Sequence, residues 1–101
     1  MKLPSRNEVE VLQLLAGGRE LYGLELIRRS GGVLKRNSIY VVLGRMEDQG
    51  YIKGREVKVE GTPGLPRRLY KVTGLGQQAL AMWSAAQAVQ ATWGKLKPAG
   101  A

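Results

Sequence analysis

Residues 37–50 have the sequence NSIYVVLGRMEDQG, which is the most informative stretch for predicting the fold. Its large apolar residues recur at the spacing of an α-helix. One side of that helix consists of Ile39, Val42, Leu43 and Met46. The opposite side consists of Asn37, Tyr40, Val41, Gly44, Arg45 and Asp48. Because Asn37 and Ser38 are good N-terminal caps and Gly50 is placed for a C-terminal cap, we predict a helix that packs by one face and presents the other.

Two more helices are predicted before this stretch. Ser5-Arg6-Asn7-Glu8 has the form of a capping box, so a first helix is expected from about Arg6 to Ala16, ended by Gly17-Gly18. Apolar residues at helical spacing predict a second helix from about Leu21 to Ser30.

After Gly50 the period of the pattern changes to that of strands. Residues 55–60 alternate as a half-exposed strand does, and residues 67–72 can pair with them across a turn-rich tip at residues 61–66. Thr73 is a plausible cap for a last helix over about residues 75–94. Within it, Gly74-Leu75-Gly76-Gln77-Gln78-Ala79 matches the dinucleotide-binding pattern, but that motif needs a second parallel strand and a later acidic residue, so a turn and cap are predicted instead.

The predicted fold is therefore mostly α with a β-hairpin: a winged helix-turn-helix with a C-terminal dimerisation helix. We expect the DNA-binding domain over residues 1–73, the dimerisation helix over residues 74–95 and a frayed tail over residues 96–101. A chain of 101 residues, 44% of them hydrophobic and 24% charged, is the size and composition of one such unit.

Composition excludes several function classes. The chain has no Cys and no His, which removes thiolate and imidazole chemistry, and Glu47 and Asp48 are adjacent on a helix and diverge by about 100°. We therefore expect no enzyme, no metal site and no cofactor. No apolar run is long enough for a membrane span, so a cytoplasmic protein is expected.

The positive charge is concentrated on the part that should read nucleic acid. The net charge is +8, and residues 35–71 hold nine basic against four acidic side chains. Such a surplus favours a polyanionic partner, although a solvated charged face is the plain alternative. The predicted DNA-binding residues are Lys35, Arg36, Asn37, Ser38, Tyr40, Val41, Gly44, Arg45, Arg67 and Arg68. Gly44 has two interpretations, a close approach to DNA or room for a neighbouring side chain within the protein.

The last helix carries no charged residue between Val72 and Lys95, which predicts burial by a second chain. The predicted dimerisation or ligand residues are Met82, Trp83, Ala86, Val89 and Trp93. Aromatic surfaces at a two-fold interface can also hold a planar ligand, while a packed dimer core without ligand is the plainer interpretation.

Four motifs, in order and spacing, resemble the PadR-type transcriptional regulators. They are Glu10–Leu15 with Leu21–Ile27, then Ser38-Ile39-Tyr40 with Leu43 and Arg45-Met46-Glu47, then Gly50-Tyr51-Ile52, and then Pro66–Thr73, within a match over residues 8 to about 81. The resemblance implies a dimeric repressor whose third helix enters the major groove, whose wing touches the DNA backbone and whose last helix dimerises. It also implies that an aromatic ligand can bind at the dimer interface, as in some members. Arg36 and Val41 stand where the family usually carries Pro.

The sequence thus predicts a homodimeric, sequence-specific regulator that binds a double-stranded DNA operator, most simply as a repressor. Two alternatives stay open: a winged-helix protein that grips nucleic acid through the backbone alone, RNA included, and a protein-interaction adaptor whose basic face is incidental. Strong preference for one duplex sequence separates the first from both others.

Overall fold

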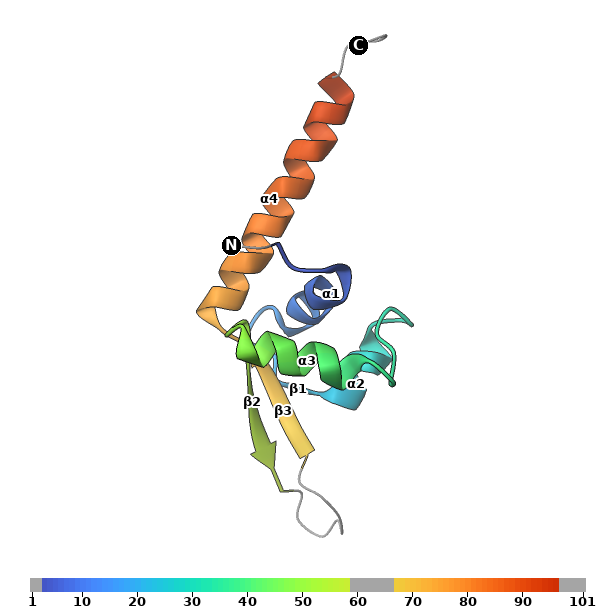
Figure 1. Ribbon diagram of the computed structural model, residues 1–101, viewed down its shortest axis with the longest axis vertical. Coiled ribbons are helices and arrows are strands. Elements are labelled where there is room, and N and C mark those ends of the chain that lie inside the picture. The colour runs from blue at the N-terminus through green and yellow to red at the C-terminus, as the bar shows by residue number, and fades with distance from the viewer. Residues whose placement is uncertain (1–2, 59–66, 97–101) are drawn as a thin grey trace.

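A computed structural model describes residues 3–58 and 67–96, and for residues 92–96 it describes the backbone alone. Four helices surround or extend from a small antiparallel sheet (Figure 1). The helices are α1 (Arg6–Leu15), α2 (Gly23–Arg29), α3 (Ile39–Asp48) and α4 (Gly74–Leu96). The strands are β1 (Leu21–Tyr22), β2 (Ile52–Val57) and β3 (Arg67–Val72). This is the predicted winged helix-turn-helix with a C-terminal helix.

The helix ends follow the local signals in the sequence. Ser5 and Glu8 form the predicted capping box at the start of α1: the Glu8 carboxylate accepts from the Ser5 amide at 2.9 Å. Gly50 has a φ of 80° after the end of α3, and the amides of Gly50 and Tyr51 donate back to the carbonyls of Glu47 and Met46. This pattern closes the last turn of the helix with a left-handed glycine.

The predicted second helix is wrong at its start. Leu21 and Tyr22 form β1, which pairs with Tyr70 and Leu69 of β3, so that α2 begins only at Gly23. The Tyr22 amide donates to the Glu25 carboxylate at 2.9 Å, which holds the turn from strand to helix. Helical spacing of apolar residues could not reveal this, because the strand exists through pairing with a segment almost fifty residues away.

The sheet has the order β1-β3-β2, and every pairing is antiparallel. Ile52 pairs with Val72 and Val57 with Arg67, so β2 begins three residues earlier than the predicted strand at Arg55. The predicted end of that strand and the turn-rich tip at 61–66 fall in residues 59–66, outside the described residues.

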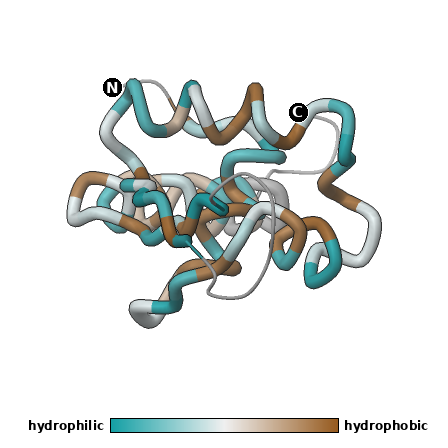
Figure 2. Tube along the Cα trace, turned by 90° about the horizontal axis from the view of Figure 1, so that it is seen from below, coloured by the Kyte–Doolittle hydropathy of each residue, from teal (hydrophilic) through white to brown (hydrophobic). Residues whose placement is uncertain are grey.

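The core lies between the three short helices and the inner face of the sheet. Its fully buried large side chains are Val11, Leu12, Leu15, Leu26, Leu34, Ile39, Leu43 and Met46. Figure 2 shows hydrophilic and hydrophobic residues alternating along the helices and strands, as expected when each element has one face in a single core.

α4 leaves this core and runs away from it, toward the end of the molecule opposite the wing formed by β2 and β3 (Figure 1). Thr73 caps it as predicted, since its hydroxyl accepts from the Gly76 amide at 3.1 Å and donates to the Gly50 carbonyl at 2.5 Å. A Cβ at Gly76 would overlap the Tyr51 carbonyl oxygen. The glycine of the supposed dinucleotide motif therefore serves close packing of α4 on the body. Within the described part of the chain, no helix is long and apolar enough to cross a membrane, α4 included.

Candidate nucleic-acid interface

α3 lies across the front of the molecule and has one buried and one open side (Figure 1). Ile39, Leu43 and Met46 are buried, as predicted, whereas Val42 is half-buried at the margin of the core. On the outward side Val41 is 57% exposed, and Gly44 and Asp48 are exposed beside it. A single exposed apolar side chain is ordinary on a protein surface, so Val41 shows only that this side of α3 is open to a partner.

The segment that leads into α3 is exposed and basic. Lys35, Arg36 and Asn37 are all exposed, and the amides of Ser38 and Ile39 both donate to the Lys35 carbonyl, which folds the segment into a turn. Ser38 is the N-cap residue, although its hydroxyl makes no capping hydrogen bond within the described residues. Two cations therefore come directly before the N-terminus of α3, the end of a helix that favours an anion.

An open notch of about 650 Å³ lies between the starts of α2 and α3 and the wing. Three arginines and three tyrosines line it together with one carboxylate, that of Glu25, and with Gly23 and Leu24; the arginines and tyrosines are Tyr22, Arg28, Tyr40, Arg67, Arg68 and Tyr70. The Arg67 guanidinium carbon lies 5.9 Å from the centroid of the Tyr22 ring, within the range of a cation–π contact. The Tyr40 side chain packs so closely on the start of α2 that a Cβ at Gly23 would come within 3.0 Å of its ring. The sequence pointed to Tyr40, Arg67 and Arg68 here, but not to Tyr22 or Arg28.

Arg68 is engaged by a carboxylate. Its Nε donates to Glu47 Oε1 at 3.0 Å and its Nη2 to Oε2 at 3.1 Å, which joins β3 to the last turn of α3. This hydrogen bonding raises the pKa of the Arg68 guanidinium. The neighbouring Tyr70 is 4% exposed, and burial raises the pKa of its hydroxyl, to which the Glu47 charge adds. Both groups therefore keep their ordinary protonation state at neutral pH.

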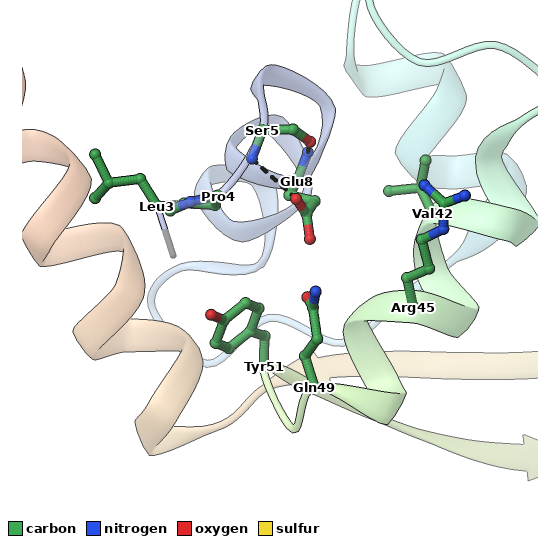
Figure 3. A pocket seen from close by; sticks show the side chains of 8 residues that line it. All are labelled: Leu3, Pro4, Ser5, Glu8, Val42, Arg45, Gln49 and Tyr51. Carbon is green, nitrogen blue, oxygen red and sulfur yellow. Dashed lines mark hydrogen bonds between the residues drawn. The ribbon is translucent and has the colours of Figure 1, made fainter. Parts of the chain in front are cut away.

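A smaller cavity of about 370 Å³ lies on the other side of α3 (Figure 3). Its lining comes from the N-terminal segment, α1, α3 and the turn that follows α3: Leu3, Pro4, Ser5, Glu8, Val42, Arg45, Gln49 and Tyr51. Arg45 rises from α3 beside this cavity, so it stands at the edge of the outward face near α1 rather than at its centre. Tyr40 and Glu47 occupy the opposite edge, next to the wing.

The predicted dimerisation residues of α4 differ in how exposed they are. Ala79 is buried, and Trp83 and Ala86 are half-buried on the side that faces the body. Met82 and Val89 are 44% and 67% exposed and border these residues along the same apolar stripe, as does Leu75. The Trp93 side chain lies outside the described residues.

A helical core with an exposed third helix, a wing beside it and a protruding C-terminal helix defines the class of winged-helix proteins. Residues 11–82 match the family model described as "Transcriptional regulator PadR-like family", and the chain belongs to this family. The resemblance that the sequence motifs indicated is thereby confirmed. Among proteins of curated function, none matches the chain.

Solved structures agree with this assignment. Bacillus subtilis PadR in complex with operator DNA is 31% identical over 79% of this chain and 48% of the PadR chain, with a TM-score of 0.67. A PadR family regulator from Eggerthella lenta is 25% identical over 92% of this chain and 82% of its own, with a TM-score of 0.74. A third, from Clostridium difficile, is 21% identical over 93% of this chain and all of its own, with a TM-score of 0.71, and supports the fold alone.

Proposed function

We propose that this protein is a homodimeric transcriptional regulator that binds a specific double-stranded DNA operator. It acts in the cytoplasm as a repressor, by occupying the operator. The observation that carries the proposal is the joint placement of the outward face of α3 and the basic notch on one side of the fold. The B. subtilis relative, solved with operator DNA, supports the choice of duplex DNA as the partner.

α3 is suited to enter a major groove, whose width of about 12 Å admits one helix. Asn37, Tyr40 and Arg45 supply donors and acceptors around the outward face, and Val41 supplies an apolar contact for a thymine methyl. Gly44 lies between them, and apart from its chain neighbours and the backbone of α3 itself, no described atom lies within 4 Å of a Cβ built there. Room for a neighbouring side chain therefore does not explain this glycine, which favours its other interpretation, a close approach of the helix backbone to DNA.

The notch is suited to the sugar-phosphate strand that separates one groove from the next. If α3 lies in the major groove and the wing follows the neighbouring minor groove, that strand crosses the space between them. Arg28 and Arg67 face this space, and the Tyr40 side chain, 55% exposed, stands at its edge. Contacts of this kind fix the position of the protein on the duplex, whereas the outward face of α3 reads the bases.

The proposed dimer is supported by the exposed apolar residues of α4. Leu75, Met82 and Val89 are spaced seven residues apart and form one exposed apolar line along the helix. The helix extends beyond the body and carries no charge over residues 73–94. We therefore propose that a second copy of the same helix packs against it and buries its apolar side chains. Two-fold symmetry would then present two α3 helices to two half-sites.

A ligand is a finer part of the proposal. Trp83 is half-buried near the exposed line of α4, so a planar aromatic compound could lie between protomers. Linkage requires that such a compound quench tryptophan fluorescence and change operator affinity in the same titration. Quenching alone would mean adventitious binding, and the ligand would be withdrawn from the proposal.

Selection of bound fragments from random duplex DNA at near-physiological salt tests the proposal. We expect one enriched two-fold symmetric sequence, with half-sites one helical turn apart or a multiple of it. Binding without enrichment would favour the alternative of a backbone grip, and a preference for RNA would favour its RNA form. Failure to bind any nucleic acid would favour the adaptor.

A further inference from the structure

The ion pair between Glu47 and Arg68 connects the two parts of the interface. Glu47 lies in the last turn of α3, and Arg68 is the second residue of β3. Both guanidinium contacts are hydrogen bonds, at 3.0 and 3.1 Å, to different carboxylate oxygens. A two-pronged contact of this type sets orientation as well as distance, because the planar guanidinium fits the carboxylate in one arrangement.

Gly54 provides the surface on which this pair lies. It stands on β2 opposite Tyr70. A Cβ at Gly54 would overlap Glu47 Oε1 and come within 2.7 Å of Arg68 Nε. The φ angle of Gly54 is not positive, so its backbone conformation does not require glycine. Glycine inside a strand weakens the strand. Here the glycine is explained by the space that the ion pair needs above β2.

The neighbouring arginine is placed differently. Successive side chains of a strand point to opposite faces, and Arg67 stands over the Tyr22 ring at the rim of the notch. The side chain of Glu47 is 24% exposed and that of Arg68 41%. The Glu47 charge also stands next to a surface that is proposed to meet a polyanion. Electrostatics alone would disfavour a carboxylate there, unless it positions another group.

We propose that the Glu47–Arg68 pair, seated on Gly54, is a latch that fixes the wing relative to α3, and that Arg68 is a positioning residue rather than a phosphate contact. This inference rests on the proposed function, because the latch aligns two surfaces that must reach adjacent grooves of one duplex. A fixed angle between the wing and α3 lets both surfaces bind without the entropy cost of ordering the wing. Binding to the correct sequence is thereby favoured over binding to others.

Glu47→Gln gives the sharpest test, because it keeps the shape of the side chain and removes a negative charge. The probes are a duplex selected from the random pool and a mixed-sequence duplex of equal length. Charge removal alone predicts tighter binding to both. The latch predicts binding to the selected duplex that is weaker by about threefold to tenfold, a typical size for lost coupling between neighbouring groups. Unchanged or tighter binding to the selected duplex would overturn the latch.

Arg68→Lys separates positioning from phosphate contact. Lysine keeps the charge but lacks the fork, so a phosphate contact predicts little change, whereas the latch predicts the same loss as Glu47→Gln. Arg55→Lys is the matched control, because Arg55 also pairs with a carboxylate, that of Glu20 at 2.9 Å, but is not among the proposed DNA contacts; it should bind both duplexes as the wild type does. The double variant Glu47→Gln/Arg68→Lys should lose no more than either single variant. Additive losses would mean that the two side chains act separately.

Salt dependence adds an independent measurement. In Arg68→Gln the slope of log affinity against log salt on the mixed-sequence duplex should equal that of the wild type, whereas loss of a phosphate contact would make it shallower by about one per protomer.

Gly54→Ala leaves every charge in place and should reproduce the loss of Glu47→Gln, with folding checked by circular dichroism. A wild type that binds no duplex would overturn the proposed function and the latch together. Normal wild-type binding with unaffected variants would overturn the latch alone.

Discussion

Gly44 and Gly76 are both helical glycines, but their surroundings differ completely. Beyond its own helix backbone and chain neighbours, a Cβ at Gly44 would meet no described atom within 4 Å, whereas one at Gly76 would overlap the Tyr51 carbonyl oxygen. Gly44→Ala should therefore raise the free energy of unfolding by about 1 kcal/mol, the usual gain of alanine over glycine in a helix. Gly76→Ala should lower it by about 1 to 3 kcal/mol, because a backbone oxygen cannot move aside easily. Thermal unfolding of the two variants provides the comparison.

The same Gly44→Ala variant also tests the proposed approach of α3 to DNA. If the helix backbone lies against the duplex, the added methyl group weakens binding to the selected duplex although the protein is more stable. A gain in stability with unchanged affinity would show that DNA does not approach this position.

Residues at the edge of the face should behave differently: Arg45→Ala should relax the preference at a few base pairs by about 1 to 3 kcal/mol. A uniform loss over all duplexes would mean that Arg45 contacts phosphate.

At the scale of elements, the wing carries an unfavourable pair on its outer face. Lys53 and Lys71 are directly opposite each other on β2 and β3, and both are exposed. Like charges in this position destabilise a sheet, so Lys53→Glu should raise the free energy of unfolding by about 0.2 to 1 kcal/mol. Lys58→Glu makes the same change of charge beyond the end of β2 and is the control. A gain that does not shrink at high salt would contradict the electrostatic origin.

How far the elements could be predicted depended on whether their causes are local. α1, α3 and their caps follow from residues within one or two turns, such as Ser5 with Glu8 and Gly50 after Asp48. β1 could not be predicted, because Leu21 and Tyr22 form a strand only through pairing with β3. The first half of β2 was missed because Gly54 interrupts the alternation there, and the reason for Gly54 lies on other elements.

The same distinction holds for the candidate site. The outward face of α3 follows from helical periodicity, so Val41 and Gly44 could be placed from the sequence. The notch could not, because it forms where β1 pairs with β3 and brings Tyr22 and Arg28 beside Arg67. Nor does the sequence reveal that Arg68, unlike Arg67, is held by a carboxylate of α3.

At the scale of the whole molecule, the exposed line of α4 should hold two copies together. Val89→Glu places a charge on a side chain that is 67% exposed, so the fold of one chain should persist while the dimer dissociates. Ser84→Glu, exposed on another side of the same helix, should leave the dimer intact. Sedimentation at micromolar concentration distinguishes the two. A wild type that sediments as a monomer would contradict the dimer directly.

A positively charged side of the fold, formed by α3, the segment before it and the wing, is proposed to bind the backbone of duplex DNA. A titration of wild-type protein with duplex DNA at several salt concentrations tests it most directly. With about three to five phosphate contacts per protomer, the slope of log affinity against log salt should lie around −5 to −9 for the dimer. A slope near zero would contradict the claim, because no counterions would then be released from the DNA.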